Sequence, residues 1–416
     1  MQLHVADPIL GHVKYLLRPD YHRVVLEWTR KYGGIFRIRL LTDWTVVVTD
    51  PAVAGQVLSN IHGRTANYAL VDEVLGGPGK TSMFGTPNEA EWRNVRKATA
   101  PAFSMSNVRR YYGGVLSAAA ELLTALDAAA AGREDESGVA AEPLLQRLML
   151  RATLEGLFEV PDATALPGFD TLAADVSRLM TESNVQITNP PRALWYRWSP
   201  VATLLSRHFA ECRRALRRTV VFHTATAARI LARPDPPPDC SLLVCRDVAV
   251  RVGPYALPAG TVVWPILYGI HVSDANWEEA ECFRPERWLE DPRCAFVKSE
   301  GATDAAAPGS GPATPTAAGA WEEGGAPAAP RRFMPFGEGP KNCVGQNFGI
   351  TVVRSVVALL LGRYRWALAP DMLTELRGGV ERAAGWPVTV EDTARLTQVA
   401  VVTKLRRLQL VPRRRE

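Results

Sequence analysis

The clearest chemistry in the sequence belongs to one cysteine in a glycine-rich loop. Cys343 follows the run Phe336-Gly-Glu-Gly-Pro-Lys-Asn and precedes Val-Gly345, after which an apolar stretch beginning near Gln346 predicts a helix. Loop amides and the N-terminal end of that helix favour the charged form of the sulfur. Because the thiolate is the form that ligates metal ions, this loop suits a metal-bound sulfur.

The residues around Cys343 also suit a flat cofactor. Glycines at positions 337, 339 and 345 let the backbone turn sharply and leave space beside it. Lys341 supplies a cation that can neutralise a carboxylate of such a cofactor. The alternative is that Cys343 is an ordinary buried thiol and that the glycines only close a turn.

Four residues of this loop carry a family resemblance. Phe336, Gly339, Cys343 and Gly345 match the pattern F-x-x-G-x-x-x-C-x-G, which resembles the haem-binding loop of the cytochrome P450 family. The resemblance implies that Cys343 is the axial thiolate of the iron in heme b (iron protoporphyrin IX), that Phe336 shields the sulfur and that Gly339 permits close approach of the haem. Lys341 stands where the family usually has Arg or His, so the charge is kept but the planar fork is lost.

Other stretches resemble the family in the same order along the chain. Trp92 and Arg96 are four residues apart, hence on one helix face, and resemble the family's Trp and Arg that reach a haem propionate. The resemblance implies that Trp92, Arg96 and Lys341 hold the propionates. Phe283-Arg-Pro-Glu-Arg287-Trp288 resembles the P-E-R-F element, and it is preceded by Leu257-Pro-Ala-Gly260-Thr261 and by His271, which resemble the usual strand and H-x-D-like turn.

The resemblance fails in the middle of the chain. No A-G-x-D/E-T-like stretch precedes Cys343, and Asp392-Thr393 lies after it, in the wrong order. Glu211-Cys-Arg-Arg214 has the spacing of the family's E-x-x-R pair, which bonds the P-E-R-F Arg, but it lies far upstream. We therefore expect a deletion near residues 232–238, a fold that is incomplete in the middle, and an Arg287 without a partner.

The periodicity of apolar residues predicts the elements that position these residues. Helices are predicted from His22 to Tyr32, from Pro51 to about Leu58, several between Glu89 and Met180, one from Leu204 to Ala232 and one from Phe348 to Leu361. Alternation predicts strands at Ile35–Leu40 and at 44–48, with short ones near 247–252 and 261–264. The fold class is therefore mainly α with a small β-sheet region, and the resemblance implies a cytochrome P450-like fold.

The whole chain, 1–416, is expected to form a single haem domain with one insertion. Residues 301–330 contain 11 Ala, 6 Gly and 5 Pro. Such a composition offers too few large apolar groups to offset the entropy of ordering. We therefore predict a low-complexity disordered insertion at about 295–330, which interrupts the domain without ending it because the apolar pattern resumes at Phe333.

Composition and charge exclude several classes of protein. With 416 residues, of which 47% are hydrophobic, the chain is too long and too apolar for a small disulfide-stapled scaffold. The net charge of +5 is spread along the chain, which disfavours nucleic-acid binding, and six irregularly spaced cysteines indicate a reducing compartment.

The seven histidines show no metal spacing with cysteine and are interpreted as surface or capping residues. Gly76–Thr81 resembles the end of a phosphate-binding loop, but the first glycine of the pattern G-x-x-x-x-G-K-T is absent.

Membrane contact and localisation stay open at this point. The longest runs of apolar residues, such as 356–361, are far shorter than the roughly 20 residues that cross a bilayer, so no spanning segment is expected. The abrupt start is compatible with a lost leader, which would decide between a cytoplasmic and a membrane-associated protein.

The resemblance implies a haem-dependent monooxygenase that oxidises a small apolar organic substrate. It would use O2 and electrons from a reductase or a ferredoxin-type donor. Two alternatives follow from the missing middle: a haem-thiolate isomerase or dehydratase of a pre-oxygenated substrate, which needs no proton relay to O2, and a catalytically silent truncated member.

Overall fold

A computed structural model describes most of the chain outside its central and low-complexity stretches. The described residues are 7–16, 18, 20–59, 83, 86, 88–131, 138–188, 192, 195, 201, 205–231, 250–252, 255–257, 261–280, 284–290, 332–370, 396–399, 402–405 and 408–415. The predicted deletion near 232–238, the predicted insertion at 295–330, the stretch Gly76–Thr81 and Asp392-Thr393 lie outside these residues.

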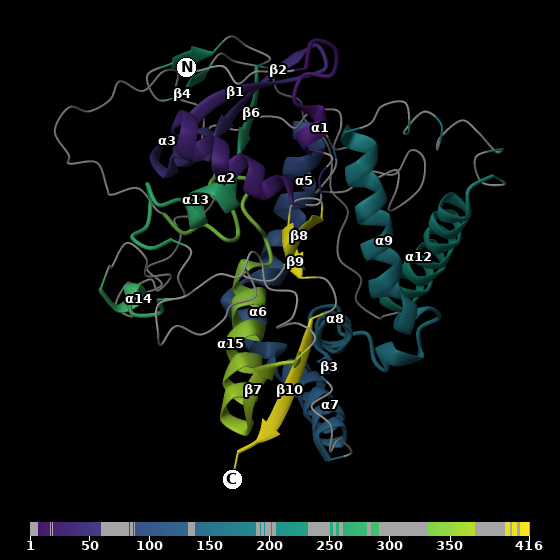
Figure 1. The fold of residues 1–416 in the computed structure, drawn as a ribbon. Coiled ribbons are helices and arrows are strands. Elements are labelled where there is room, and N and C mark those ends of the chain that lie inside the picture. The colour runs from purple at the N-terminus through teal and green to yellow at the C-terminus, as the bar shows by residue number, and fades with distance from the viewer. Residues whose placement is uncertain are drawn as a thin grey trace.

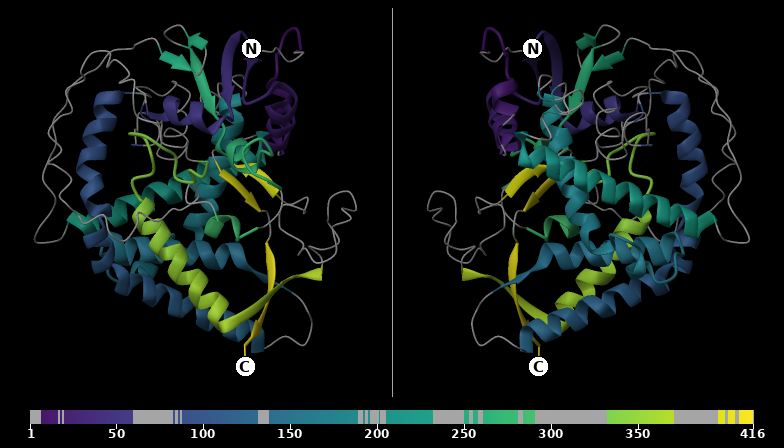
Figure 2. Two further views of the ribbon diagram at one scale, coloured as in Figure 1. Left: turned by 90° about the vertical axis from the view of Figure 1, so that its left-hand side faces the viewer. Right: turned by 90° about the vertical axis from the view of Figure 1, so that its right-hand side faces the viewer.

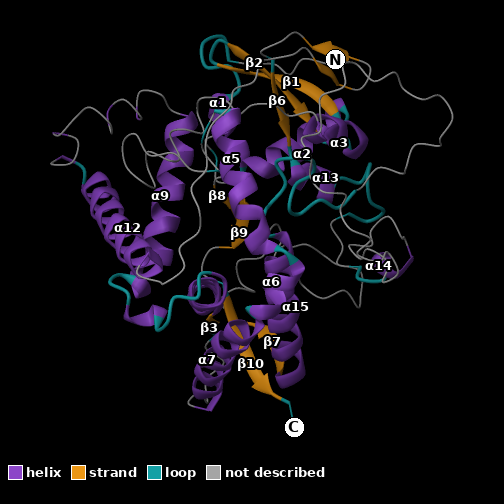
Figure 3. Cartoon of the chain, turned by 180° about the vertical axis from the view of Figure 1, so that it is seen from behind, coloured by secondary structure: helices purple, strands orange, loops and turns teal. Residues whose placement is uncertain are grey.

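Helices dominate the described part of the chain (Figure 3). In chain order they are α1 (Val13–Leu16), α2 (Tyr21–Tyr32), α3 (Pro51–Ser59), α5 (Glu89–Thr99), the 3₁₀ turn η1 (Ala100–Phe103), α6 (Met105–Arg110), α7 (Tyr112–Ala131), α8 (Ala141–Arg151), the π-helical turn η2 (Ala152–Leu157), the 3₁₀ turn η3 (Ala163–Ala165), α9 (Phe169–Thr188), α12 (Arg207–Leu231), α13 (Leu267–Val272), α14 (Arg287–Glu290) and α15 (Gln346–Arg363).

The strands among the described residues are short and form four small sheets. They are β1 (Ile35–Leu40), β2 (Asp43–Val48), β3 (Val139–Ala140), β4 (Val250–Val252), β5 (Tyr255–Leu257), β6 (Val262–Pro265), β7 (Tyr364–Leu368), β8 (Leu396–Val399), β9 (Val402–Leu405) and β10 (Gln409–Arg414). The sheet orders are β1-β2-β6, β3-β10-β7, β4-β5 and β8-β9. The fold class predicted from the sequence, mainly α with a small β-sheet region, is confirmed.

The N-terminal sheet and α2 enclose one apolar core. β1 pairs with β2 in antiparallel register, Ile35 opposite Val48, and β2 pairs with β6 in parallel. Apolar side chains of α2 recur at helical spacing and pack on this sheet through Val25, which is fully buried. α2 ends at Gly33, whose φ of 85° suits a residue without a side chain. α3 and α13 complete this end of the molecule, which lies at the top of Figure 1.

A second core holds the helix that follows Cys343. α7, α8 and α15 meet at the end of the molecule that carries the C-terminus, where β7 and β10 pair antiparallel (Figure 2). Phe348, Val352 and Val356 of α15 occur at i, i+4 and i+8 and are buried against α7. This packing fixes α15, and with it the direction of the loop that ends at Gly345.

α9 and α12 form a helix pair at one side of the molecule, on the right in Figure 1. Leu179, Cys212 and Ala215 are fully buried between them. Arg218 donates two hydrogen bonds to Asp175 across the pair, from Nε at 2.7 Å and from Nη2 at 2.5 Å. The pair is therefore held by both apolar and charged contacts.

One described helix meets the length and composition criterion for crossing a membrane, namely α7. No spanning segment was expected from the sequence, because α7 owes its apolar character to many alanines rather than to a run of large apolar residues. Val115, Ala118 and Leu122 of α7 are buried in the C-terminal core, and its Glu121 pairs with Arg147 and Arg151 of α8.

Candidate functional site

The loop that presents Cys343 is closed by its own backbone. The Cys343 N–H donates to the Phe336 carbonyl at 2.8 Å, and the Asn342 N–H donates to the Gly339 carbonyl at 3.2 Å. Gly337 and Gly339 have φ of 74° and 71°, in the left-handed region that favours glycine. The loop therefore reverses direction twice before α15 begins.

Gly339 brings this loop against α3. A Cβ atom at Gly339 would lie 2.2 Å from the carbonyl oxygen of Leu58, so any side chain there would push the loop and the end of α3 apart. This contact gives the glycine a structural role in addition to the one that the sequence pattern suggests.

Cys343 is exposed, and its side chain lies at the N-terminal end of α15. The alternative interpretation of Cys343 as a buried thiol is therefore wrong. A Cβ atom at Gly345 would lie 3.9 Å from the Cys343 sulfur and 3.3 Å from the Phe103 ring, so Gly345 keeps this side of the sulfur open. The Phe336 ring packs on Gly349 of α15.

Arg96 of α5 holds the residue next to Cys343. Its guanidinium donates to the Asn342 backbone carbonyl at 2.5 Å and to the Asn342 side-chain oxygen at 2.6 Å. Burial lowers the pKa of Arg96, while the nearby Cys343 raises it. α5 is well fixed for this task, because Asn88 caps it by accepting from the Ala90 and Glu91 N–H groups.

Lys341, in the loop itself, contacts the same helix, α5. Its ammonium is 2.6 Å from a carboxylate oxygen of Glu89 and 4.7 Å from the centre of the Trp92 ring. The side chains of Lys341 and Glu89 are 8% and 11% exposed, and Trp92 is buried, so this is a largely desolvated ion pair beside an aromatic face. The sequence predicted Lys341 and Trp92 but missed Glu89, which lies one turn before Trp92 on the same face.

His271 anchors the start of the loop. Its Nε2 accepts a hydrogen bond from the Met334 N–H at 3.0 Å, and Arg332 donates to the Asn276 carbonyl at 2.8 Å. Burial lowers the pKa of His271 to about 4, so the ring is neutral and able to accept this bond at neutral pH.

The structure thus brings the predicted residues of the loop and of α5 together, and it adds Asn342, Glu89 and Phe103. Asn342 and Phe103 carry no signal in the sequence, because their contacts depend on how α5 and η1 meet the loop. Arg287 does not lie in this group.

The expectation that Arg287 lacks a partner is wrong. Its guanidinium donates to the backbone carbonyls of Arg284, Glu278 and Glu279, at 3.0 to 3.2 Å. The local loop supplies carbonyl oxygens, which accept the guanidinium hydrogen bonds without neutralising its charge. Glu211, the candidate for the E-x-x-R pair, instead contacts Arg178 and Arg207.

The interpretation of the histidines as surface or capping residues is also wrong for several of them. His12 and His22 are buried, at 0% and 1% exposure, among the aromatic residues Tyr15, Trp28 and Tyr268. His208 lies one helical turn before Cys212, with its Nε2 3.5 Å from the Cys212 sulfur, so a His–Cys pair at metal-binding spacing is present after all.

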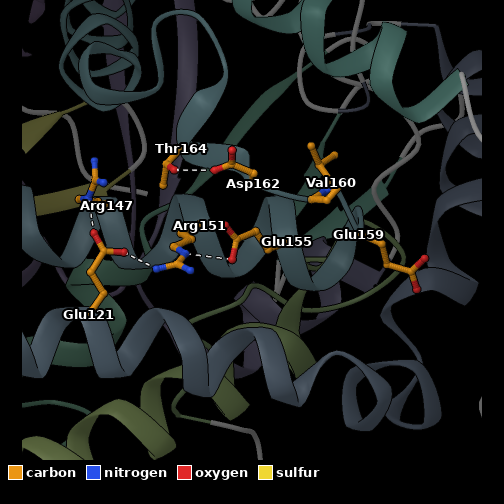
Figure 4. Close-up of a pocket in the computed structure, with 9 residues that line it drawn as sticks. Glu121, Arg147, Arg151, Glu155, Glu159, Val160, Asp162 and Thr164 are labelled. Atoms are coloured by element: carbon orange, nitrogen blue, oxygen red, sulfur yellow. Dashed lines mark hydrogen bonds and ion pairs between the residues drawn. The ribbon is translucent and has the colours of Figure 1, made fainter.

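A charged cavity of about 710 Å³ lies between α7 and the α8–η2 segment, away from Cys343 (Figure 4). Arg147 and Arg151 both contact Glu121 in it, and Arg151 also contacts Glu155. Its lining carries four carboxylates and two guanidinium groups, so it does not suit an apolar substrate.

Comparison with known proteins identifies similar sequences. The family model described as Cytochrome P450 matches residues 4–232 and 243–378. The interruption between the two matched parts includes most of the junction where the sequence predicts a deletion, and the predicted insertion falls inside the second part.

Similar curated proteins match the chain over shorter stretches. Cytochrome P450 714A2 of Arabidopsis thaliana is 27% identical over 122 residues, 29% of this chain and 17% of that protein. Cytochrome P450 81Q32 of Catharanthus roseus is 32% identical over 111 residues, 26% of this chain and 22% of that protein. Cytokinin hydroxylase of Arabidopsis thaliana is 25% identical over 123 residues, 29% of this chain. The matched regions thus span about a fifth of the first two relatives.

Proposed function

Because the chain belongs to the cytochrome P450 family, we propose that it is a haem-dependent monooxygenase whose Cys343 ligates the iron of heme b. The observation that carries this proposal is the exposed Cys343 sulfur at the start of α15, on a loop held by Arg96. When bound, haem supplies the activation of O2 for insertion of one oxygen atom into an apolar organic substrate. Electrons come from a reductase or a ferredoxin-type donor.

The donor set fits this cofactor. An exposed sulfur at the N-terminal end of the 18-residue helix α15 offers one soft ligand. Arg96 and Lys341 place two cations beside the loop, where they suit the propionate carboxylates of haem. Both cations already contact protein oxygens, so we propose that Asn342 and Glu89 orient them and share them with the carboxylates.

The other predicted residues shape the loop. Gly339 lets the loop approach α3, Gly345 keeps one side of the sulfur open, and Phe336 fastens the loop to α15 through Gly349. Trp92 gives Lys341 an aromatic face that holds the ammonium in place. In this proposal the chain's contribution is a rigid, electropositive setting for one sulfur.

The test is a difference absorption spectrum of the reduced, CO-bound full chain, expressed with a supply of haem. We expect a red-shifted, thiolate-type Soret band that is lost in Cys343→Ala and retained in Cys294→Ala, the matched removal of another thiol. A chain that takes up no haem, or a band that survives Cys343→Ala, would contradict the proposal.

One feature of the sequence favours a second candidate. No acid and alcohol pair of the oxygen-activating type precedes Cys343, and such a pair is unnecessary for a haem-thiolate isomerase or dehydratase of a pre-oxygenated substrate. Turnover of an organic peroxide without any reductase, together with no turnover of apolar substrates with a reductase and O2, would favour this candidate. A chain that binds haem but does neither is the catalytically silent member.

A further inference from the structure

Three potential metal ligands of different kinds meet where α9 packs on α12. Glu182 comes from the C-terminal part of α9, and His208 and Cys212 come from the first two turns of α12. The ligand atoms of the three side chains all lie within 4.8 Å of one another. Glu182 and Cys212 are buried, whereas 45% of the His208 side chain is exposed, so the cluster opens to solvent on one side.

The distances in the cluster resemble those between ligands of one ion. The His208 Nε2 lies 3.5 Å from the Cys212 sulfur and 2.7 Å from the nearer Glu182 oxygen. Tetrahedral zinc with ordinary bond lengths separates sulfur from nitrogen by about 3.5 Å and nitrogen from oxygen by about 3.3 Å. The distance between the His208 nitrogen and the Cys212 sulfur already has the value expected for zinc. The distance between the His208 nitrogen and the Glu182 oxygen must increase by about 0.6 Å, which opens their hydrogen bond.

We propose that Glu182, His208 and Cys212 bind a divalent transition-metal ion of the zinc class, which links α9 to α12 and keeps one coordination position for water. The set of one thiolate, one imidazole and one carboxylate suits zinc and cobalt(II). This site is independent of the function proposed for Cys343.

Glu182 can keep its present partners while it binds the ion. Gln186 donates to its Oε1 at 3.0 Å, and Arg192 donates from Nε to Oε1 at 3.0 Å and from Nη2 to Oε2 at 2.7 Å. Oε2 therefore turns to the ion, while Oε1 stays bonded to Gln186 and Arg192. Such outer contacts orient a ligating carboxylate.

Binding of the ion releases one proton from Cys212. Burial, together with the charges of Glu182 and Glu211, raises the pKa of this thiol to about 11, and Arg178 and Arg192 oppose the shift. Because the ion must displace that proton, its affinity increases with pH through the neutral range.

The test is a titration of the purified full chain with Co2+, followed by its thiolate-to-cobalt and visible absorption bands. We expect one equivalent of tetrahedral Co2+, displaced by Zn2+, with the same signal in Cys343→Ala, which removes the thiolate of the other site. His208→Gln should weaken binding by at least about 100-fold, because loss of an outer-sphere contact alone costs 10- to 100-fold.

His208→Gln is suited to this test because the His208 side chain is partly exposed, and circular dichroism checks that the variant folds. Cys212→Ser should abolish the thiolate-to-cobalt band. Absence of a tetrahedral Co2+ spectrum in the wild-type chain, or a signal unchanged by His208→Gln, would overturn the proposal and leave a hydrogen-bonded cluster.

Discussion

Arg96 connects α5 to the loop that presents Cys343 across 246 positions of sequence. Its two hydrogen bonds to Asn342 involve a charged donor, and such bonds each contribute about 1.5–3 kcal/mol. Burial lowers its pKa, and the nearby Cys343 opposes this shift, so the surroundings on balance penalise the cation.

We expect Arg96→Ala to lower the free energy of unfolding by at least about 1.5–3 kcal/mol, the contribution of one such bond, because it removes both bonds to the loop. Arg93→Ala, on the same helix, is the matched control, since the Arg93–Glu89 pair is half exposed and contributes less than about 1 kcal/mol. Urea unfolding monitored by tryptophan fluorescence measures both. Equal losses in the two variants would contradict the role given to Arg96.

His271 makes the anchoring of the loop sensitive to pH. Its pKa is lowered to about 4 in the fold, from 6.5, so the unfolded chain takes up a proton on this ring at a higher pH than the folded chain does. The contribution of neutral His271 to the free energy of unfolding is therefore fully present above pH 6.5. It decreases as the pH falls toward 4, by up to about 3 kcal/mol.

In His271→Gln this loss between pH 6.5 and 4 should become smaller, because an amide oxygen accepts from the Met334 N–H without titrating. Burial also lowers the pKa of His223, so a part of the decrease in the free energy of unfolding with falling pH remains in this variant. Urea unfolding at several pH values measures the difference. A variant with the slope of the wild-type chain would show that His271 is not responsible.

At the scale of elements, α7 and the end of α15 are tied by one carboxylate. Asp127 of α7 accepts from the Arg363 guanidinium and from the Tyr364 hydroxyl, the latter at 2.6 Å. The Arg363 hydrogen bond, followed by the Tyr364 bond, lowers the pKa of Asp127 from 3.8 to about 2. The carboxylate therefore stays charged in the folded chain at a pH where it is protonated in the unfolded chain.

We predict that this contribution to stability is present above about pH 4 and is lost as the pH falls from about 4 to 2. Asp127→Asn should be less stable than the wild-type chain at pH 6, and the difference should shrink as the pH approaches 2. Thermal unfolding followed by circular dichroism measures it. A constant difference across this range would argue against the ion pair.

The sequence predicted elements well where periodicity was strong, as in α2, α3, α15 and the β1–β2 pair. It also placed Cys343 at the start of α15, because a Gly-rich loop before an apolar helix is a local signal. It could not predict contacts between distant segments. Lys341 with Glu89, Arg96 with Asn342, and Glu182 with His208 each join two elements, and their meeting depends on packing that local patterns do not encode.

At the scale of the whole molecule, the side of α15 opposite its buried face remains uncovered. Val353, Val357 and Leu361 occur at i, i+4 and i+8, and they are 56%, 45% and 53% exposed. An exposed apolar stripe of this kind favours self-association.

We expect the folded chain to bind an environment-sensitive apolar dye, and the double variant Val357→Gln, Leu361→Gln to bind less of it. Because both positions are exposed, each change should alter the free energy of unfolding by no more than about 0.5 kcal/mol. Val356→Gln, at the buried neighbouring position, is the control and should destabilise the fold instead. Dye fluorescence unchanged in the double variant would place the bound dye elsewhere.

The bond between Arg332 and Asn276 closes a loop of 56 residues, which includes the predicted insertion. For an unstructured loop, the entropy of closure depends on the logarithm of length, so removing 295–330 would lower its cost by only about 1 kcal/mol. By this relation, the free energy of unfolding depends only weakly on the number of residues that an unstructured segment places between Asn276 and Arg332.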